Sequence, residues 1–162
     1  MIDILNYNAG NMLSLYRALE KLNQPYKIIK KFDQITSDIL IIPGVGNFSS
    51  ASLRIKEKGF NELQKYAPEN RPFVIGICLG MQLLFSNSYE GGFSNGLNLL
   101  EGSVIKIPTK IDGLSIPRTL IGWENIELNI TKDFEWINKF SLSSNYHVHS
   151  YMCSPKNNIE II

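Results

Sequence analysis

The sequence has few of the features that mark secreted, membrane or nucleic-acid-binding proteins. Its 162 residues include two cysteines, too few for a disulfide framework, so we expect a reducing, cytoplasmic location. No run approaches the ~20 apolar residues of a membrane span, and the N-terminus lacks the basic flank and apolar core of a signal peptide. The formal net charge of +1 gives no electrostatic basis for binding nucleic acid or an anionic membrane. These absences indicate a cytosolic globular protein.

Length and composition predict one folded domain over residues 1–162. Apolar residues make up 44% of the chain and charged residues 19%, a balance too apolar for disorder. A chain of this length buries roughly two-thirds of its unfolded surface, which suffices for an independent core. The sequence contains no internal repeat, low-complexity tract or linker.

Segments typical of strands and helices alternate in the first half. Short apolar runs predict strands at 2–5, 26–30, 39–42 and 73–77, and the continuous run Ile39–Ile42 suits a strand covered on both faces. Helical spacing predicts helices at 11–22, 49–65 and 79–86. The alternation predicts an α/β fold, a three-layer sandwich with a central, mostly parallel sheet. Beyond Gly91, turn residues and short apolar pieces predict a β-rich, antiparallel second half.

One cysteine lies in a pattern typical of a catalytic nucleophile. Gly76-Ile77-Cys78-Leu79-Gly80 falls between a predicted strand and a predicted helix, which is the arrangement of a nucleophile elbow. Cys78 would then lie at a helix N-terminus, where the thiolate is favoured. The N–H of Leu79 would be placed to donate to an oxyanion. The alternative interpretation is a small, buried, structural cysteine.

A second glycine-rich segment follows another predicted buried strand. Pro43-Gly44-Val45-Gly46 is expected at the carboxyl edge of the sheet, where open α/β folds place their ligand crevices. A backbone rich in glycine can turn an N–H group towards a developing negative charge. A plain turn is the alternative.

Together these segments resemble the class I, or triad-type, glutamine amidotransferases. More narrowly, they are similar to the branch that serves imidazole glycerol phosphate synthase. The resemblance covers essentially the whole chain and rests on the following residues: Gly76 to Phe85, Pro43 to Gly46 with Phe48, Tyr7, Gly10, Asn11 and Ser14, Ser88, Glu90 and Gly91, Gly96-Leu97, Gly122-Trp123, and Val148-His149-Ser150-Tyr151.

The resemblance implies a cofactor-free and metal-free glutaminase. Cys78 would attack the side-chain amide of L-glutamine and form a thioester that water hydrolyses. The backbone N–H groups of Leu79 and of Gly44, Val45 and Gly46 would hold the oxyanion. The substrate-binding residues would be Gln82, Glu90, His149, Ser150 and Tyr151. Without the resemblance, Gln82 is better interpreted as a solvated helix position and Glu90 as a turn carboxylate.

The resemblance also implies a partner protein. Ammonia would pass to a cyclase or synthase subunit in a heterodimer that makes imidazole glycerol phosphate in histidine biosynthesis. Trp123, Arg118 and Asn11 are the predicted interface residues, although Trp123 also fits a position in the core. Arg118 and Glu124 replace the family's usual histidine and asparagine around this tryptophan. The alternative is therefore a paralogue that supplies ammonia for amidination of a sugar in surface-polysaccharide synthesis.

One family feature is missing from the sequence. The family takes its general base from a His-Pro-Glu segment, and this chain contains no such segment and only two histidines, His147 and His149. We interpret the chain as a C-terminally incomplete amidotransferase domain that is inactive alone. The alternatives are a naturally shortened, non-catalytic interaction subunit, and a base role for His149.

Two hypotheses come from other classes of protein. His147, His149 and Cys153 lie close enough in sequence to suggest a metal site, although a fourth ligand is not apparent. A hydrolase or chaperone with a cysteine elbow would share a similar sheet, but the run Leu79-Gly80-Met81-Gln82 argues against it.

Overall fold

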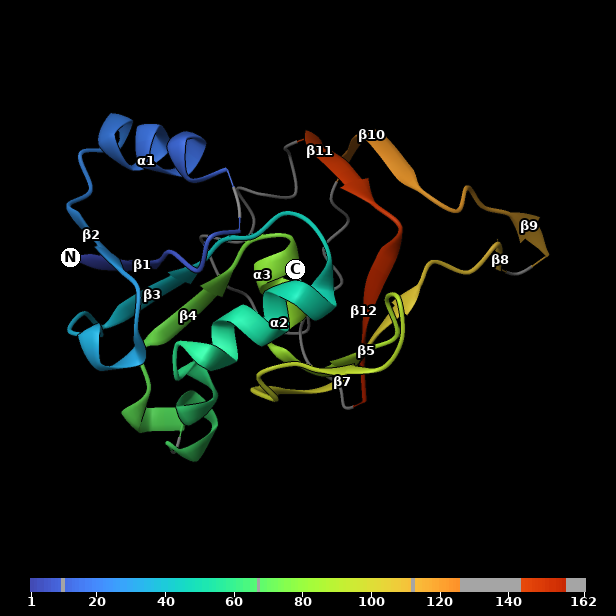
Figure 1. Cartoon of the computed structure of the whole chain (residues 1–162). Coiled ribbons are helices and arrows are strands. Elements are labelled where there is room, and N and C mark those ends of the chain that lie inside the picture. Colours follow the sequence, from blue (N-terminus) through green and yellow to red (C-terminus); the bar gives the residue numbers. More distant parts are fainter. Residues whose placement is uncertain (10, 67, 112, 126–143, 157–162) are drawn as a thin grey trace.

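The first half of the chain builds a parallel four-stranded sheet. A computed structural model describes residues 1–9, 11–66, 68–111, 113–125 and 144–156 (Figure 1). The sheet has the order β2-β1-β3-β4, with all three pairings parallel. Its strands are β1 (Ile2–Leu5), β2 (Tyr26–Ile29), β3 (Ile39–Ile42) and β4 (Phe73–Gly76), close to the predicted runs.

Helices cover both faces of this sheet, as the apolar strands require. Alternate residues of a strand point to opposite faces, so Ile4 and Ile41 meet helix α1 (Met12–Lys21) on one side. Leu40 and Ile42 pack on the other side, against helix α2 (Phe48–Glu57) and the 3₁₀ helix η2 (Phe60–Lys65). The predicted three-layer arrangement is confirmed. Two short 3₁₀ helices, η1 (Phe32–Gln34) and η3 (Pro68–Asn70), complete the connections.

Two predicted helices are shorter than expected. The predicted helix 49–65 is interrupted because Gly59 adopts a φ of 85°, in the left-handed region that ends helices. The predicted helix 79–86 is wrong beyond Leu83: α3 spans Leu79–Leu83, and Phe85–Ser88 form strand β5. Phe85 and Ser88, at the two ends of this strand, are both buried. Burial of residues three positions apart is also typical of a helix, so the pattern along the sequence did not distinguish the two.

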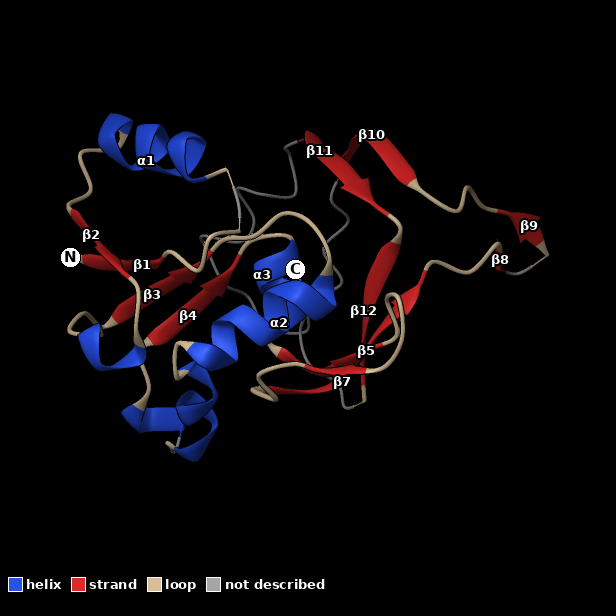
Figure 2. Ribbon diagram, viewed as in Figure 1, coloured by secondary structure: helices blue, strands red, loops and turns tan. Residues whose placement is uncertain are grey.

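The second half is rich in strands (Figure 2). Strands β6 (Ser94–Asn95), β7 (Leu100–Lys106) and β12 (Tyr151–Pro155) join β5 in a sheet of order β12-β7-β5-β6. Two antiparallel ribbons stand beside it: β8 (Lys110–Ile111) with β9 (Leu114–Ser115), and β10 (Leu120–Asn125) with β11 (Ser144–His149). The prediction of antiparallel pairing holds except for β5 and β7, which pair in parallel.

The part of the chain that the structure describes holds no helix long and apolar enough to cross a bilayer.

Candidate active site

Cys78 occupies a strained turn between β4 and α3. Its backbone has φ 53° and ψ −112°, a region that non-glycine residues rarely adopt. Cys78 is the residue that precedes the first helical position, and its side chain is exposed. Strain of this kind persists where surrounding structure enforces it, and it is characteristic of functional sites. The geometry is that of the predicted nucleophile elbow, and the alternative of a buried structural cysteine is wrong.

The two glycines of the elbow are explained by close backbone approach. A Cβ on Gly80 would collide with the carbonyl oxygen of Ile42 at the end of β3. A Cβ on Gly76 would lie 2.6 Å from the backbone nitrogen of Met81. The glycine at position 80 therefore lets the turn pack against β3, and the glycine at position 76 lets α3 begin directly above the end of β4.

Cys78 opens into a pocket of about 490 Å³. The pocket brings together segments that are far apart in the sequence: the loop that follows β3, the elbow, the turn before β6, and the β10–β11 ribbon with the start of β12. The lining residues are Val45, Gly46, Cys78, Leu79, Gln82, Glu90, Thr119, Tyr146, Val148, His149, Ser150 and Tyr151. Every residue predicted for catalysis, the oxyanion or the substrate lines this pocket, except Gly44.

Gly44 lies beneath the pocket wall. A Cβ at Gly44 would meet the hydroxyl of Tyr7 and would lie 3.1 Å from the backbone nitrogen of Gly80. The same hydroxyl donates a hydrogen bond of 2.7 Å to the carbonyl oxygen of Pro43. Tyr7 is completely buried, and its pKa is raised chiefly by that burial, so it stays a neutral donor. Sequence reasoning missed this supporting role, because a tyrosine after a strand carries no local signal of a partner 36 residues away.

Glu90 is held in place by a helix N-terminus. One carboxylate oxygen, Oε2, accepts a hydrogen bond of 2.8 Å from the backbone N–H of Phe48, the first residue of α2. The side chain of Asn47 caps the same helix by accepting from the Ser50 N–H. A carboxylate is stabilised at this end of a helix by free N–H groups and by the dipole. Glu90 thus presents a positioned negative charge to the pocket.

Gln82 joins the elbow helix to the strands of the second half. It is only 9% exposed, so its interpretation as a solvated helix position is wrong. Its Nε2 donates to the carbonyl oxygen of Tyr151 at 3.3 Å. On the same wall the hydroxyls of Thr119 and Ser150 are hydrogen bonded at 2.8 Å. Thr119, Tyr146 and Val148 line the pocket but were not predicted, because only the β10–β11 pairing brings them to it.

The two histidines lie next to each other on β11. Their ring centroids are 5.5 Å apart, and His149 reaches the pocket whereas His147 does not line it. Burial, and secondarily the proximity of His147, lower the pKa of His149, which is therefore neutral at neutral pH. Among the described residues, no three histidine, cysteine or acidic side chains are grouped to hold a metal ion.

Cys153 has surroundings opposite to those of Cys78. It is partly buried in β12 and packs against the main core. Burial raises the pKa of its thiol to about 12, and the nearby Cys78 contributes in the same direction. Since the thiolate is the reactive form, we expect Cys153 to react slowly at neutral pH.

The β10–β11 ribbon carries an exposed apolar face beside the pocket. Ile121 lies opposite Val148, and Trp123 opposite Tyr146, so all four side chains share one face. Trp123 is 70% exposed, and its ring lies 5.6 Å from that of Tyr146. The interpretation of Trp123 as a core residue is therefore wrong. Arg118 and Asn11 are also exposed, and Asn11 caps α1 by accepting from the Ser14 N–H.

Comparison with known proteins agrees with this geometry. The family described as glutamine amidotransferase class-I matches residues 3–162. The chain is 37% identical over 159 residues to the imidazole glycerol phosphate synthase subunit HisH of Bacillus licheniformis, covering 95% of this chain and 73% of the relative. It is 38% identical over 155 residues to subunit HisH 1 of Campylobacter jejuni, covering 93% and 74%.

A solved structure shares the fold. It is described as a crystal structure of glutamine amidotransferase, and it superposes with a TM-score of 0.62 at 20% identity over 92% of this chain and 70% of that one. Because the family match spans nearly the whole chain and the elbow, pocket and sheet agree with it, the chain belongs to the class I glutamine amidotransferases.

Proposed function

We propose that this chain is the glutamine-hydrolysing subunit of an imidazole glycerol phosphate synthase. The observation that carries the proposal is the exposed, strained Cys78 at the mouth of a pocket lined by Gln82 and Glu90. The identity of 33–38% to HisH subunits supports the assignment to histidine biosynthesis.

The pocket suits a zwitterionic amino acid with a neutral side-chain amide. Glu90 supplies a fixed carboxylate for the α-ammonium group, since only its Oε2 is used by the Phe48 N–H. The amide oxygen of Gln82 is available as an acceptor, because its Nε2 is the atom that contacts Tyr151. His149, Ser150 and Tyr151 complete the wall opposite the elbow and would bind the carboxylate end.

The reaction would proceed through a thioester. The sulfur of Cys78 attacks the side-chain carbonyl carbon of glutamine, and the carbonyl oxygen becomes an oxyanion. The N–H of Leu79, in the first turn of α3, and the N–H groups of the Gly44–Gly46 segment would stabilise it. Loss of one such donor typically slows a reaction by ~10²–10³-fold. The proton given up by the Cys78 thiol is transferred to the amide nitrogen, the carbon–nitrogen bond breaks and ammonia leaves. Water then hydrolyses the glutamyl thioester to glutamate and restores the thiol.

Among the described residues, no base is hydrogen bonded to Cys78. Over the described ranges, neither histidine is hydrogen bonded to Cys78, although neutral His149 lines the same pocket. A base must lie within hydrogen-bond reach of the proton it takes. We therefore expect the 162-residue chain to present the nucleophile and the substrate pocket but to turn over slowly.

Ammonia would be delivered to a cyclase partner. At neutral pH free ammonia is mostly protonated and not nucleophilic, so a docked acceptor is advantageous. The apolar face of the β10–β11 ribbon borders the pocket through Tyr146 and Val148, and Trp123 has the size and exposure of an interface anchor. Arg118 and Asn11 would flank this contact. An unprotected catalytic thiol functions in a reducing compartment, so we place the complex in the cytoplasm.

Covalent labelling tests the proposal. A diazoketone analogue of L-glutamine should modify Cys78 and not Cys153, whose raised thiol pKa leaves almost no thiolate. Excess L-glutamine should protect Cys78, whereas D-glutamine should not. Peptide mass mapping of the wild type and of Cys78→Ser reads out the site. Label found only on Cys153, or no protection by L-glutamine, would refute the assignment.

A further inference from the structure

A second hollow, of about 750 Å³, lies at the carboxyl edge of the sheet beside β1 and β2. Lys30 and Lys31 follow directly after β2, and Tyr7 and Asn8 follow after β1. Arg54 and Glu57 lie in the C-terminal half of α2 and Lys58 is its C-cap, a spacing that brings all three to one side of the helix. The hollow and the pocket of Cys78 share no lining residue.

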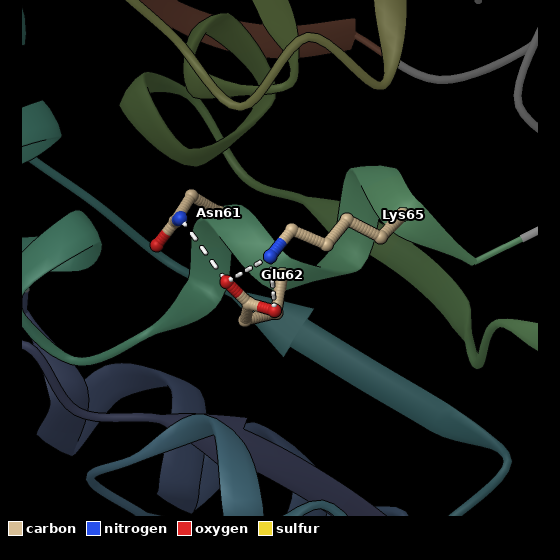
Figure 3. A network of polar contacts seen from close by, with 3 residues as sticks. All are labelled: Asn61, Glu62 and Lys65. Carbon is tan, nitrogen blue, oxygen red and sulfur yellow. Dashed lines mark hydrogen bonds and ion pairs between the residues drawn. The ribbon is translucent and has the colours of Figure 1, made fainter.

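The hollow has an unbalanced positive charge. Lys30, Lys31, Arg54 and Lys58 face a single carboxylate, Glu57, although the whole chain has a formal net charge of +1. In the described part of the chain none of these five side chains forms an ion pair, whereas Lys65 pairs with Glu62 on η2 at 2.8 Å (Figure 3). Like charges that converge on a concavity without carboxylate partners raise the local concentration of anions.

Part of this charge is held in a fixed position. Arg54 donates from Nη1 to the carbonyl oxygen of Asn8 at 2.7 Å, which orients the guanidinium and leaves its other N–H groups available. Over the same described residues, the ammonium groups of Lys30, Lys31 and Lys58 donate no hydrogen bond. An oriented guanidinium and several ammonium groups are a donor set that suits phosphate oxygens.

We propose that this hollow binds a small phosphorylated molecule through its phosphate group. The hollow is open to solvent but concave, and its volume of about 750 Å³ is in the range of small-molecule sites, which favours a compact anion over the flat acidic surface of a protein. The excess of positive charge favours a ligand with at least two negative charges. Tyr7 lines the hollow and also donates a hydrogen bond to the carbonyl oxygen of Pro43, which precedes the Val45–Gly46 segment. A bound anion would therefore lie close to this hydrogen bond but outside the glutamine pocket.

Binding of inorganic phosphate and of pyrophosphate tests the proposal. Titrations followed by amide NMR at constant ionic strength should show saturable binding of one anion, with shifts at residues 30, 31, 54 and 58, and pyrophosphate should bind more tightly. Lys30→Gln with Lys31→Gln should weaken binding by about tenfold, the sum expected for two exposed charge contacts. Lys110→Gln, on the distant β8–β9 ribbon, is the matched control and should not change it.

A gain of affinity provides a check that does not depend on loss of folding. Glu57→Gln removes the one repelling carboxylate and should tighten phosphate binding by several-fold. Linear, unsaturable shifts would overturn the proposal, and so would equal weakening by Lys110→Gln. Binding of neither anion, with an acidic peptide bound instead, would also overturn it. Because the readout is binding at residues outside the glutamine pocket, its failure would leave the glutaminase proposal unaffected.

Discussion

Substitution of Gly80 by alanine tests whether the elbow depends on contact with β3. The added Cβ would lie 2.7 Å from the carbonyl carbon of Ile42 and still closer to its oxygen. That oxygen accepts a hydrogen bond of 3.0 Å from the Ile77 N–H, so relief of the clash would move or break it. Overpacking typically costs ~1–3 kcal/mol and a lost hydrogen bond ~1 kcal/mol. The better helix propensity of alanine offsets up to ~1 kcal/mol of this loss of stability.

We therefore expect Gly80→Ala to lower the free energy of unfolding by about 2–3 kcal/mol, measured by urea denaturation. The glutamine analogue should also label Cys78 more slowly, because the turn that presents the thiol must shift. Gly113→Ala is the control: a Cβ there meets nothing within 4 Å, and the φ of 82° adds only the cost of a left-handed alanine, ~1–2 kcal/mol. If Gly80→Ala is no less stable than wild type and labels at the same rate, the close-approach explanation of the motif is wrong.

Three further outcomes are expected. The 162-residue chain should release glutamate from L-glutamine at a negligible rate in a coupled assay, and robust release that is abolished by His149→Asn would make His149 the base. Trp123→Ala should weaken binding to the cyclase subunit by ~2 kcal/mol or more in a titration, with little change in melting temperature because the side chain is 70% exposed. A lower melting temperature with unchanged affinity would show that the docking face lies elsewhere on the molecule. The pKa of His149 is lower in the folded chain than in the unfolded chain, because the fold favours the neutral imidazole. The stability that neutral His149 contributes is therefore fully present above pH ~6.5 and is lost as the pH falls through the pKa of the folded state. His149→Asn should reduce this acid sensitivity in urea denaturation, and an unchanged pH dependence would contradict the cause given for the shift.

The strands of the first half were predictable because their signal is local. A continuous apolar run such as Ile39–Ile42 has one stable location, the middle of a covered parallel sheet, whatever the rest of the chain does. The elbow was predictable for a similar reason. Two glycines around a cysteine, at a strand-to-helix junction, describe a backbone shape that few other sequences permit.

Where apolar spacing was ambiguous, long-range packing decided the outcome. Phe85–Ser88 became a strand rather than the end of a helix because pairing with β7 and β6 was available. Gly59 ended a predicted helix, since its left-handed φ can be occupied without steric cost.

Residue types and their order were sufficient to predict the family and the residues that gather around the pocket of Cys78. Only the tertiary structure decided which atoms support them. Tyr7 holds the Pro43 segment across the sheet, Phe48 positions Glu90, and Tyr151 engages Gln82. These contacts join residues 36 to 69 positions apart, so no local pattern reports them. The same holds for Trp123, whose exposure depends on the pairing of β10 with β11. A sequence shows how apolar a side chain is, but only the tertiary structure decides whether another part of the chain packs against it.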